Sequence, residues 1–289
     1  LLVAGLTVGS GYALVALGIH IVLRATRAVN FAQGEFTVLG GLLALSAVEL
    51  LHANIWVALA LSTFCGFVLG VVYERFILRP ASRSGELGVT IATIGTVFIL
   101  LYGHALVPEW GSLPQPLPAF SGDVSKTIRL AGVTIQIQSL WIVLLLACAL
   151  AALWLFFEWT YYGKAIRAAS DNPLGARLLG INVARARSVS VGIAIALAAF
   201  GGTIIGPITL VGGAGGTAIA IKGFVGAVIG GIDSPVGCVA GGLLVGIVEK
   251  LIQGKLSYGV ADPLVYSLLL IALLVRPQGL FGSARALRD

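Results

Sequence analysis

Long apolar segments separated by short polar ones run through almost the whole of this 289-residue chain. A helix needs about 20 predominantly apolar residues to cross a bilayer, so the sequence has room for about eight or nine spans. Only 10% of the residues are charged, whereas a soluble domain carries about a quarter. We therefore expect an all-α, polytopic membrane protein that forms one transmembrane domain over residues 1–289. Because the chain begins at Leu1 and contains no methionine, we expect the native N-terminus to lie upstream.

Several of the predicted spans are short and interrupted by glycine. Segments of this kind often mark discontinuous or re-entrant helices in transporters, and the 39 glycines of the chain suit helices that pack closely in a membrane. The shortest predicted spans are residues 35–50, 219–233 and 263–275. With boundaries good to a few residues, the full set is 1–23, 35–50, 55–73, 87–107, 137–157, 188–211, 219–233, 236–252 and 263–275.

Most of the 18 basic residues fall into four groups that follow alternate spans. Nine alternating spans put all four groups on one side of the membrane, and the excess of Lys and Arg predicts that this side is the cytoplasm. On the opposite side, the prolines of residues 108–132 predict a stiff, non-helical loop. This loop could meet a soluble partner, but an ordinary connector is the simpler interpretation. The basic groups are Arg24 and Arg27; Arg75, Arg79 and Arg83; Lys164, Arg167, Arg177, Arg185 and Arg187; and Arg276, Arg285 and Arg288.

The polar segment of residues 163–187 contains a short helix with its own start and stop signals. Asn172 can serve as the N-cap, Pro173 suits the first helical position, and Gly180 supplies the left-handed residue that ends a helix. A free helix of about two turns is unstable in water, so this one needs a surface to dock against. It could receive force from a soluble motor, and an ordinary interfacial helix explains the same residues equally well. Its leucines are Leu174, Leu178 and Leu179.

Polar side chains interrupt the apolar sequence between the first two predicted spans, at Asn30, Gln33 and Glu35. Burying a carboxylate at membrane depth costs about 2.5–3.5 kcal/mol on insertion scales, so Glu35 should face protein or water. One interpretation is that the three side chains line or brace a polar pathway. The other is that Asn30 and Glu35 form a cap and turn at the cytoplasmic interface, and for Glu35 as a direct ligand this second interpretation is slightly favoured.

Hydroxyl groups add polarity to the first and fourth predicted spans. Ser10 and Tyr12 lie in the first span, where they could contribute to a path for an amphipathic solute. In the fourth span, Thr90, Thr93 and Thr96 recur every three residues and share one side of the helix. They predict either a polar stripe on the same path or hydroxyls that bond back to their own helix.

Glycine pairs spaced by four residues crowd the region from Lys222 to Glu249. Such pairs give flat helix faces that allow close contact, and the Asp233-Ser234-Pro235 step divides the apolar sequence into two short pieces. The pattern predicts a helical hairpin that packs tightly into the bundle or against a partner subunit. Lys222 is the lone base at its start, and we expect its side chain to reach toward an interface.

No catalytic or metal-binding constellation is present in the sequence. Ser10 has no base placed to activate it, and the three histidines are scattered, so we expect no metal site. The three cysteines fall inside predicted spans and suit small buried apolar positions. Nothing in the sequence favours nucleic-acid binding. There is also no phosphate-binding loop, so any ATP hydrolysis must come from another chain.

Five motifs, in order along the chain, resemble those of the LivH-type permease subunits of branched-chain amino acid ABC importers. GLTVGSGYALVALG followed by AVNFAQGEF resembles the opening signature of that family, which usually has histidine at the position of Gln33. YERFILRPASRSGELGVTIATIG and GKAIRAASDNPLGARLLGINVARAR resemble its second block and its cytoplasmic coupling region. KGFVGAVIGGIDSPVGCVAGGLLVGIVE and RPQGLFG resemble its closing motifs.

The resemblance implies a permease subunit of an ATP-driven importer in the inner membrane of a bacterium. The implied partners are a second permease, two cytosolic ATPases that bind ATP and magnesium, and an extracytoplasmic substrate-binding protein; no cofactor is expected in this chain. Branched-chain amino acids or other small amphipathic solutes, among them urea, short amides or aromatic acids, are the implied cargo. The predicted pathway residues are Ser10, Tyr12, Asn30, Gln33, Glu35 and Thr93. The predicted coupling residues are Asn172, Pro173, Leu174, Ala176, Leu178, Leu179 and Gly180.

A self-contained secondary transporter or channel is the alternative function. It would require ionisable groups inside the membrane to bind an ion or a proton. The sequence offers few candidates for such groups, and we take Glu35, Glu49 and Asp233 as the plausible ones. A requirement for an ion gradient in the absence of ATP would favour this alternative.

Overall fold

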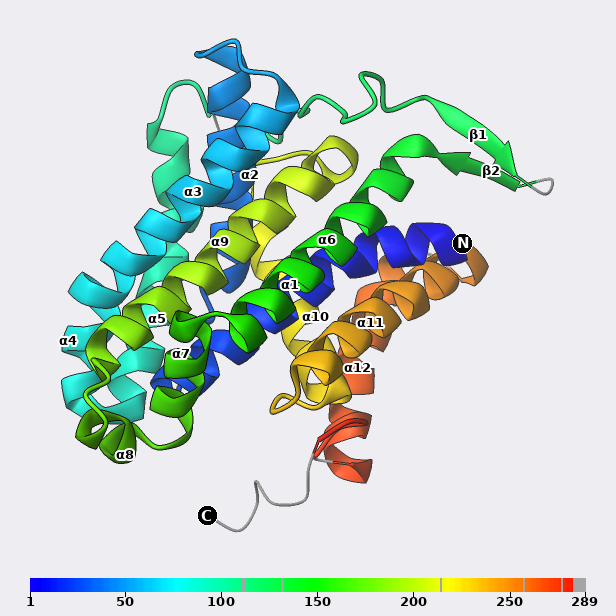
Figure 1. Ribbon diagram of the computed structural model, residues 1–289. Helices are drawn as coiled ribbons and strands as arrows, with labels where there is room; N and C mark the ends of the chain where they lie inside the picture. The colour runs from blue at the N-terminus through cyan, green and yellow to red at the C-terminus, as the bar shows by residue number, and fades with distance from the viewer. Residues whose placement is uncertain (111–112, 131–132, 214, 257, 277, 283–289) are drawn as a thin grey trace.

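The computed structural model describes residues 1–110, 113–130, 133–213, 215–256, 258–276 and 278–282. Helices dominate it (Figure 1), which confirms the all-α expectation. The helices are α1 (Leu2–Thr26), α2 (Gln33–Glu49), α3 (Ile55–Tyr73), η1 (Glu74–Leu78), α4 (Arg79–Ala81), η2 (Ser82–Ser84), α5 (Gly85–Gly103), η3 (His104–Leu106), α6 (Ile137–Trp159), α7 (Tyr161–Asp171), α8 (Pro173–Leu178), α9 (Val183–Thr209), α10 (Gly215–Gly230), α11 (Pro235–Lys255) and α12 (Tyr258–Val275).

Within the described residues, five helical stretches are long and apolar enough to cross a membrane. One of them, Ile55–Leu106, spans 52 residues and reverses direction near Gly85, whose φ of 78° is accessible to glycine at little cost. It therefore contributes two spans, α3 and α5. The other four stretches are Leu2–Thr26, Ile137–Trp159, Val183–Thr209 and Pro235–Lys255. Together with the shorter apolar helices, these stretches make the protein a multi-pass membrane protein.

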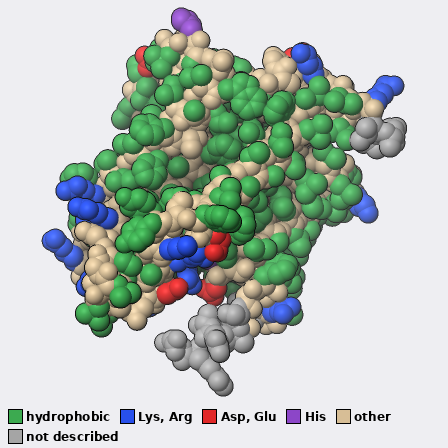
Figure 2. Space-filling view, viewed as in Figure 1, with side chains coloured by type: hydrophobic (Ala, Val, Ile, Leu, Met, Phe, Trp, Pro, Cys, Tyr) green, Lys and Arg blue, Asp and Glu red, His purple; other side chains and the backbone are tan. Residues whose placement is uncertain are grey.

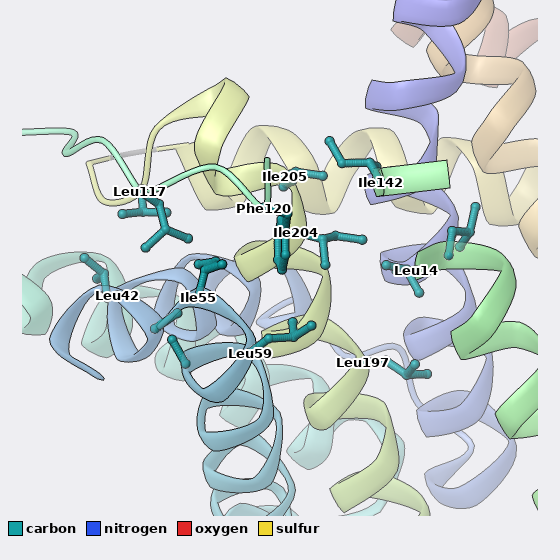
Figure 3. Packing of buried hydrophobic residues seen from close by; sticks show 14 of the residues in the cluster. Leu14, Leu42, Ile55, Leu59, Leu117, Phe120, Ile142, Leu197, Ile204 and Ile205 are labelled. Carbon is teal, nitrogen blue, oxygen red and sulfur yellow. The ribbon is translucent and has the colours of Figure 1, made fainter. Parts of the chain in front are cut away.

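Helices α1 and α9 form the centre of the bundle. Both are mostly buried, whereas only four residues of α6 are buried. Apolar side chains from α1, α2, α3, α6 and α9 meet in one core, which also receives Leu117 and Phe120 from the loop before α6 (Figure 3). Figure 2 shows that hydrophobic side chains cover most of the visible face, as expected for helices that meet lipid.

Glycine allows the closest helix contacts. A Cβ at Gly9 would lie 2.9 Å from the backbone of Leu243, which places α1 directly against α11. Gly226 and Gly242 similarly bring α10 against α11. Ser234 caps α11 by accepting a hydrogen bond from the Gly237 N–H at 3.1 Å. The predicted helical hairpin around residue 233 is therefore confirmed.

The loop opposite the basic groups folds back onto the bundle. Gln115 pairs with Val211 in an isolated antiparallel bridge, and Leu117 and Phe120 are buried. A two-stranded antiparallel hairpin follows, with β1 (Thr127–Leu130) beside β2 (Val133–Gln136) and Thr127 opposite Gln136. The sequence predicted the non-helical path through the prolines but not this hairpin, which projects from the bundle in Figure 1.

Ion pairs bring three of the four basic groups together at one end of the bundle, which we call the basic end. Arg24 at the end of α1 pairs with Asp171 of α7. Arg79 and Arg187, from the second and third groups, both pair with Glu74. The common location agrees with the alternation of spans that the sequence predicted. Two members of the fourth group, Arg285 and Arg288, lie outside the described residues.

Candidate functional site

The chain between α1 and α2 turns back into the bundle before α2 begins. Gln33, the first residue of α2, lies against Gly18 of α1 and Ala194 of α9. Gly18 precedes the end of α1 at Thr26 by eight residues, or about 12 Å along a helix. Asn30, Gln33 and Glu35 are all buried. They therefore lie inside the bundle rather than at the interface.

Two of these polar side chains hold the turn together. Asn30 Oδ1 accepts a hydrogen bond from the Ala32 N–H at 3.1 Å, and Asn30 Nδ2 donates to Gln33 Oε1 at 3.3 Å. Gln33 Nε2 donates to the carbonyl oxygen of Ala194 at 2.7 Å. Non-helical backbone at membrane depth needs such internal partners. Asn30 and Gln33 thus brace the re-entrant segment through contacts to their own turn and to α9.

Glu35 differs from its neighbours because it reaches a second discontinuous helix. Its Oε1 accepts a hydrogen bond from the hydroxyl of Thr217 at 2.8 Å, in the first turn of α10. The carboxylate also contacts Gly216, and Thr217 is exposed. Among the described residues, no Lys, Arg or His forms an ion pair with Glu35. The N-terminal ends of α2 and α10 therefore meet inside the bundle around a carboxylate that takes part in none of the ion pairs of the described residues.

The serine and threonine hydroxyls predicted for the path in the first and fourth spans bond to backbone carbonyls of their own helices. Ser10 Oγ donates to the carbonyl of Leu6 at 2.7 Å, and Thr93 Oγ1 donates to that of Thr90 at 2.8 Å. Thr96 makes the same kind of bond, to Ala92. Of the two interpretations offered for the threonines, the structure supports back-bonding. A role for Ser10 or Thr93 in a solute path stays a prediction.

Tyr12 belongs to an ionic network that the sequence analysis missed. Its hydroxyl donates to Glu249 Oε2 at 2.7 Å, and Lys222 Nζ lies 2.8 Å from both Glu249 Oε1 and Asp262 Oδ1. Lys222 and Glu249 are buried. The expectation that Lys222 is a lone base reaching toward an interface is therefore wrong, because its partners come from α11 and α12.

Two of the acidic residues proposed for an ion-coupled transporter are also corrected. Glu49 ends α2 and Asp233 lies in the turn before α11, and both are exposed. In the part of the chain that the structure describes, the buried carboxylates are instead Glu35, Glu74 and Glu249. Glu74 and Glu249 carry basic partners, which hydropathy along the chain does not reveal because those partners come from distant helices or from the next turn.

The helix predicted at Asn172–Gly180 is present as α8 at the basic end. Asn172 Oδ1 accepts a hydrogen bond from the Gly175 N–H at 2.9 Å, and Pro173 is the first helical residue. Gly180 follows with a φ of 78°, which is the left-handed conformation expected after a helix. The predicted caps are therefore confirmed.

One side of α8 packs and the other is free. Ala176 is buried against Ile166 and Ala169 of α7 and Ala186 of α9. The leucines point away from this cluster and are strongly exposed, with exposed fractions of 69% for Leu174, 83% for Leu178 and 80% for Leu179. A short helix is thus held firmly by α7 and α9 while it presents an apolar surface outward.

Discontinuous helices whose ends meet inside a multi-pass bundle are typical of membrane transport permeases. The exposed leucine surface of α8 at the basic end fits the same class of protein. The family model described as the permease component of branched-chain amino acid transport systems matches residues 1–275. The chain belongs to this family.

Individual relatives agree with that assignment. The chain is 32% identical over 291 residues to the high-affinity branched-chain amino acid transport system permease protein LivH of Salmonella typhimurium, covering 96% of this chain and 93% of the relative. It is 31% identical over 292 residues to the permease protein BraD of Pseudomonas aeruginosa, covering 97% and 94%. A probable LivH of Methanocaldococcus jannaschii is 29% identical over 286 residues, covering 93% and 88%.

A solved structure, PsaBC from Streptococcus pneumoniae in complex with Fab, shares the fold with a TM-score of 0.52 at 13% identity. The match covers 95% of this chain and 91% of that chain. At this identity the likeness concerns the fold alone.

Proposed function

We propose that this chain is a permease subunit of an ATP-driven importer for branched-chain amino acids or similar small amphipathic solutes, in the inner membrane of a bacterium. It would form the translocation path with a second, related permease and work with two cytosolic ATPases and an extracytoplasmic substrate-binding protein. Residues 1–289 would act as one permease domain, with the coupling segment at 163–187. ATP and magnesium would bind to the ATPases, and this chain would carry no cofactor. Membership of the permease family over residues 1–275 supports the proposal.

The observation that carries the coupling role is the exposed leucine surface of α8. Exposed leucine side chains on an anchored helix favour a protein partner, because contact between apolar surface and water is unfavourable and a partner would remove it. The basic end would be cytoplasmic by the excess of Lys and Arg, which is where ATPases are found. Closure of two ATPases on ATP would then pull on α8 and switch the bundle between outward- and inward-open forms.

We assign the path to the side of α10 that Glu35 approaches. Thr217 and Ile221 are exposed there, and Phe224 is half-buried beside Phe31. These α10 residues follow helical spacing and share one face, which would face the second permease. The stripe combines a hydroxyl with apolar side chains, which suits a solute that has an apolar side chain and polar ends.

A gradient-driven transporter is the alternative, and the ionisable groups of the described residues favour it less. Such a carrier needs a membrane-embedded group that is free to bind and release an ion. The buried Lys222 and Glu249 form an ion pair with each other. Glu49 and Asp233 are exposed, so Glu35 is the remaining candidate among the acidic residues proposed for that role. Family membership also favours the importer.

Purification of the tagged chain from its own host in mild detergent tests the proposal. We expect two ATPase chains and a second permease to co-purify, and the complex in liposomes to take up leucine only with ATP inside and binding protein outside. Uptake by the chain alone, driven by an ion gradient, would replace the importer with the alternative.

Glu35 provides a test of the path. Glu35→Gln keeps an oxygen that accepts from Thr217 but removes the charge, and we expect uptake to fall roughly tenfold with assembly unchanged, the size of effect that a charged hydrogen bond has. Glu49→Gln is the matched control, because it makes the same change at an exposed residue of the same helix. Equal uptake by the two variants would remove Glu35 from the path.

A further inference from the structure

A fully buried carboxylate lies at the basic end, immediately after α3. Glu74 has no exposed side-chain surface. Arg79 binds it in a fork, with Nε 3.2 Å from Oε1 and Nη2 2.7 Å from Oε2. From α9, Ser188 Oγ donates to Oε2 at 2.5 Å, and Arg187 Nε lies 3.3 Å from Oε1. We call these four residues the Glu74 clamp.

The backbone is wound to make this arrangement. Residues Glu74–Leu78 form a π-helix, in which each N–H bonds to the carbonyl five residues earlier, and the Arg79 N–H does so to Glu74. In an α-helix, residues five apart point about 140° away from each other. The π-turn brings Glu74 and Arg79 to the same side of the helix, so the Arg79 guanidinium can bind the Glu74 carboxylate. Pro80 follows and has no N–H to continue an α-helical ladder.

The clamp joins the start of α9 to the segment that leads into α5, beside a hydrophobic cluster in which Leu78 and Val89 also meet Val191 of α9. On one side it is attached to the start of α9, and the same part of α9 packs against α7 and α8 through Ala186. On the other side η1, α4 and η2 lead directly into α5. Arg187 also reaches Ser82 of η2 and the carbonyl of Leu78 at 3.4 Å.

Helix α5 is loosely held apart from this attachment. Its buried residues are Val89, Thr93 and Thr96, and a Cβ at Gly95 or Gly103 would meet open space. A helix with few buried contacts moves at low cost in free energy. Since α5 packs on Phe36 and Leu39 of α2, movement of α5 would change the packing of α2, the helix that carries Glu35.

We propose that the Glu74 clamp transmits movement of the coupling segment to α5, with the π-turn as its pivot, so that α5 opens and closes the path beside α2. Glu74 and Ser188 are positioning residues in this scheme, and neither touches the solute. The inference rests on the proposed importer function. It adds a route for force through the permease, from α8 through the start of α9 to η1 and then to α5.

The test uses the complete importer in liposomes and measures leucine uptake and ATP hydrolysis together. Glu74→Gln should leave ATP hydrolysis within about twofold and lower the uptake per ATP by about three- to thirtyfold, the range of such couplings. Glu86→Gln is the matched control, because Glu86 lies in the first turn of α5, is exposed and lies at the same end. A merely structural role for Glu74 would lower hydrolysis and uptake in parallel.

Ser188→Ala decides the question if Glu74→Gln does not assemble. This change keeps both arginines on Glu74 and removes the hydrogen bond from α9, so assembly should persist while uptake per ATP falls. An unchanged ratio in Ser188→Ala would overturn the clamp. Failure of the importer proposal has a different signature, because the unmodified complex would then show no ATP-driven uptake.

Discussion

Replacing Leu178 by aspartate should abolish solute uptake without lowering the amount of protein in the membrane. The side chain is 83% exposed, so a carboxylate there meets water and leaves the fold intact. At a protein interface, loss of a central apolar anchor costs about 2–4 kcal/mol, which corresponds to at least about thirtyfold in affinity. The ATPases should consequently bind weakly, and their hydrolysis should cease to respond to the loaded binding protein.

The measurement combines membrane levels, uptake into liposomes and ATP hydrolysis by the purified complex. Leu113→Asp is the matched control, since Leu113 is also strongly exposed but lies in the loop at the opposite end. Normal uptake by Leu178→Asp at normal expression would remove α8 from the coupling role. A loss in both variants would indicate a general sensitivity to added charge.

A single methyl group at Gly202 should strongly destabilise the folded protein. Its Cβ would overlap the carbonyl oxygen of Thr37, at the point where α9 crosses α2. Thr203 also bonds to the Gly40 carbonyl at 3.3 Å and to Ser62 at 2.8 Å, so separating the helices breaks polar contacts that no water replaces. We expect Gly202→Ala to destabilise the protein by more than about 3 kcal/mol, at the upper end of overpacking effects.

Gly95→Ala is the control for this substitution. Gly95 also lies within a helix, but a Cβ there meets open space, and alanine should stabilise the helix by about 0.5–1 kcal/mol. Thermal unfolding of the detergent-solubilised variants, followed by size-exclusion chromatography, measures both. A Gly202→Ala protein that is monodisperse and as heat-stable as the parent would contradict the close crossing of α2 and α9.

The features predicted correctly from the sequence are those that neighbouring residues determine. The caps of α8 are local, because Asn172 and Gly180 act on backbone within a turn, and the spans follow from the length of the apolar segments. Helix α7 was not separated from the polar segment around it, since an amphipathic surface helix lacks the long apolar signal of a span. The β1–β2 hairpin was not predicted either, because its two strands are only four residues long and also lack a long apolar signal.

The remaining features depend on residues far apart in the chain. Lys222 is isolated along the sequence, yet its partners Glu249 and Asp262 come from other helices. The polarity of Asn30, Gln33 and Glu35 was evident, but their depth follows from Gly18 and Ala194. The π-turn at Glu74 has no period that hydropathy detects. Long-range pairing therefore determines the interior polar groups, and a single sequence does not encode it in any local pattern.

The bond from Gln33 to Ala194 has a consequence for the synthesis of the protein. The two residues are separated by 161 positions, which a ribosome covers in roughly eight to thirty seconds. During that interval the amide of Gln33 has no α9 to bond to, and an unsatisfied polar group at that depth costs about 1–3 kcal/mol. We expect the insertion machinery or a membrane chaperone to shelter α2 until α9 emerges. Nascent chains truncated before residue 194 should consequently be recognised and degraded by membrane proteases.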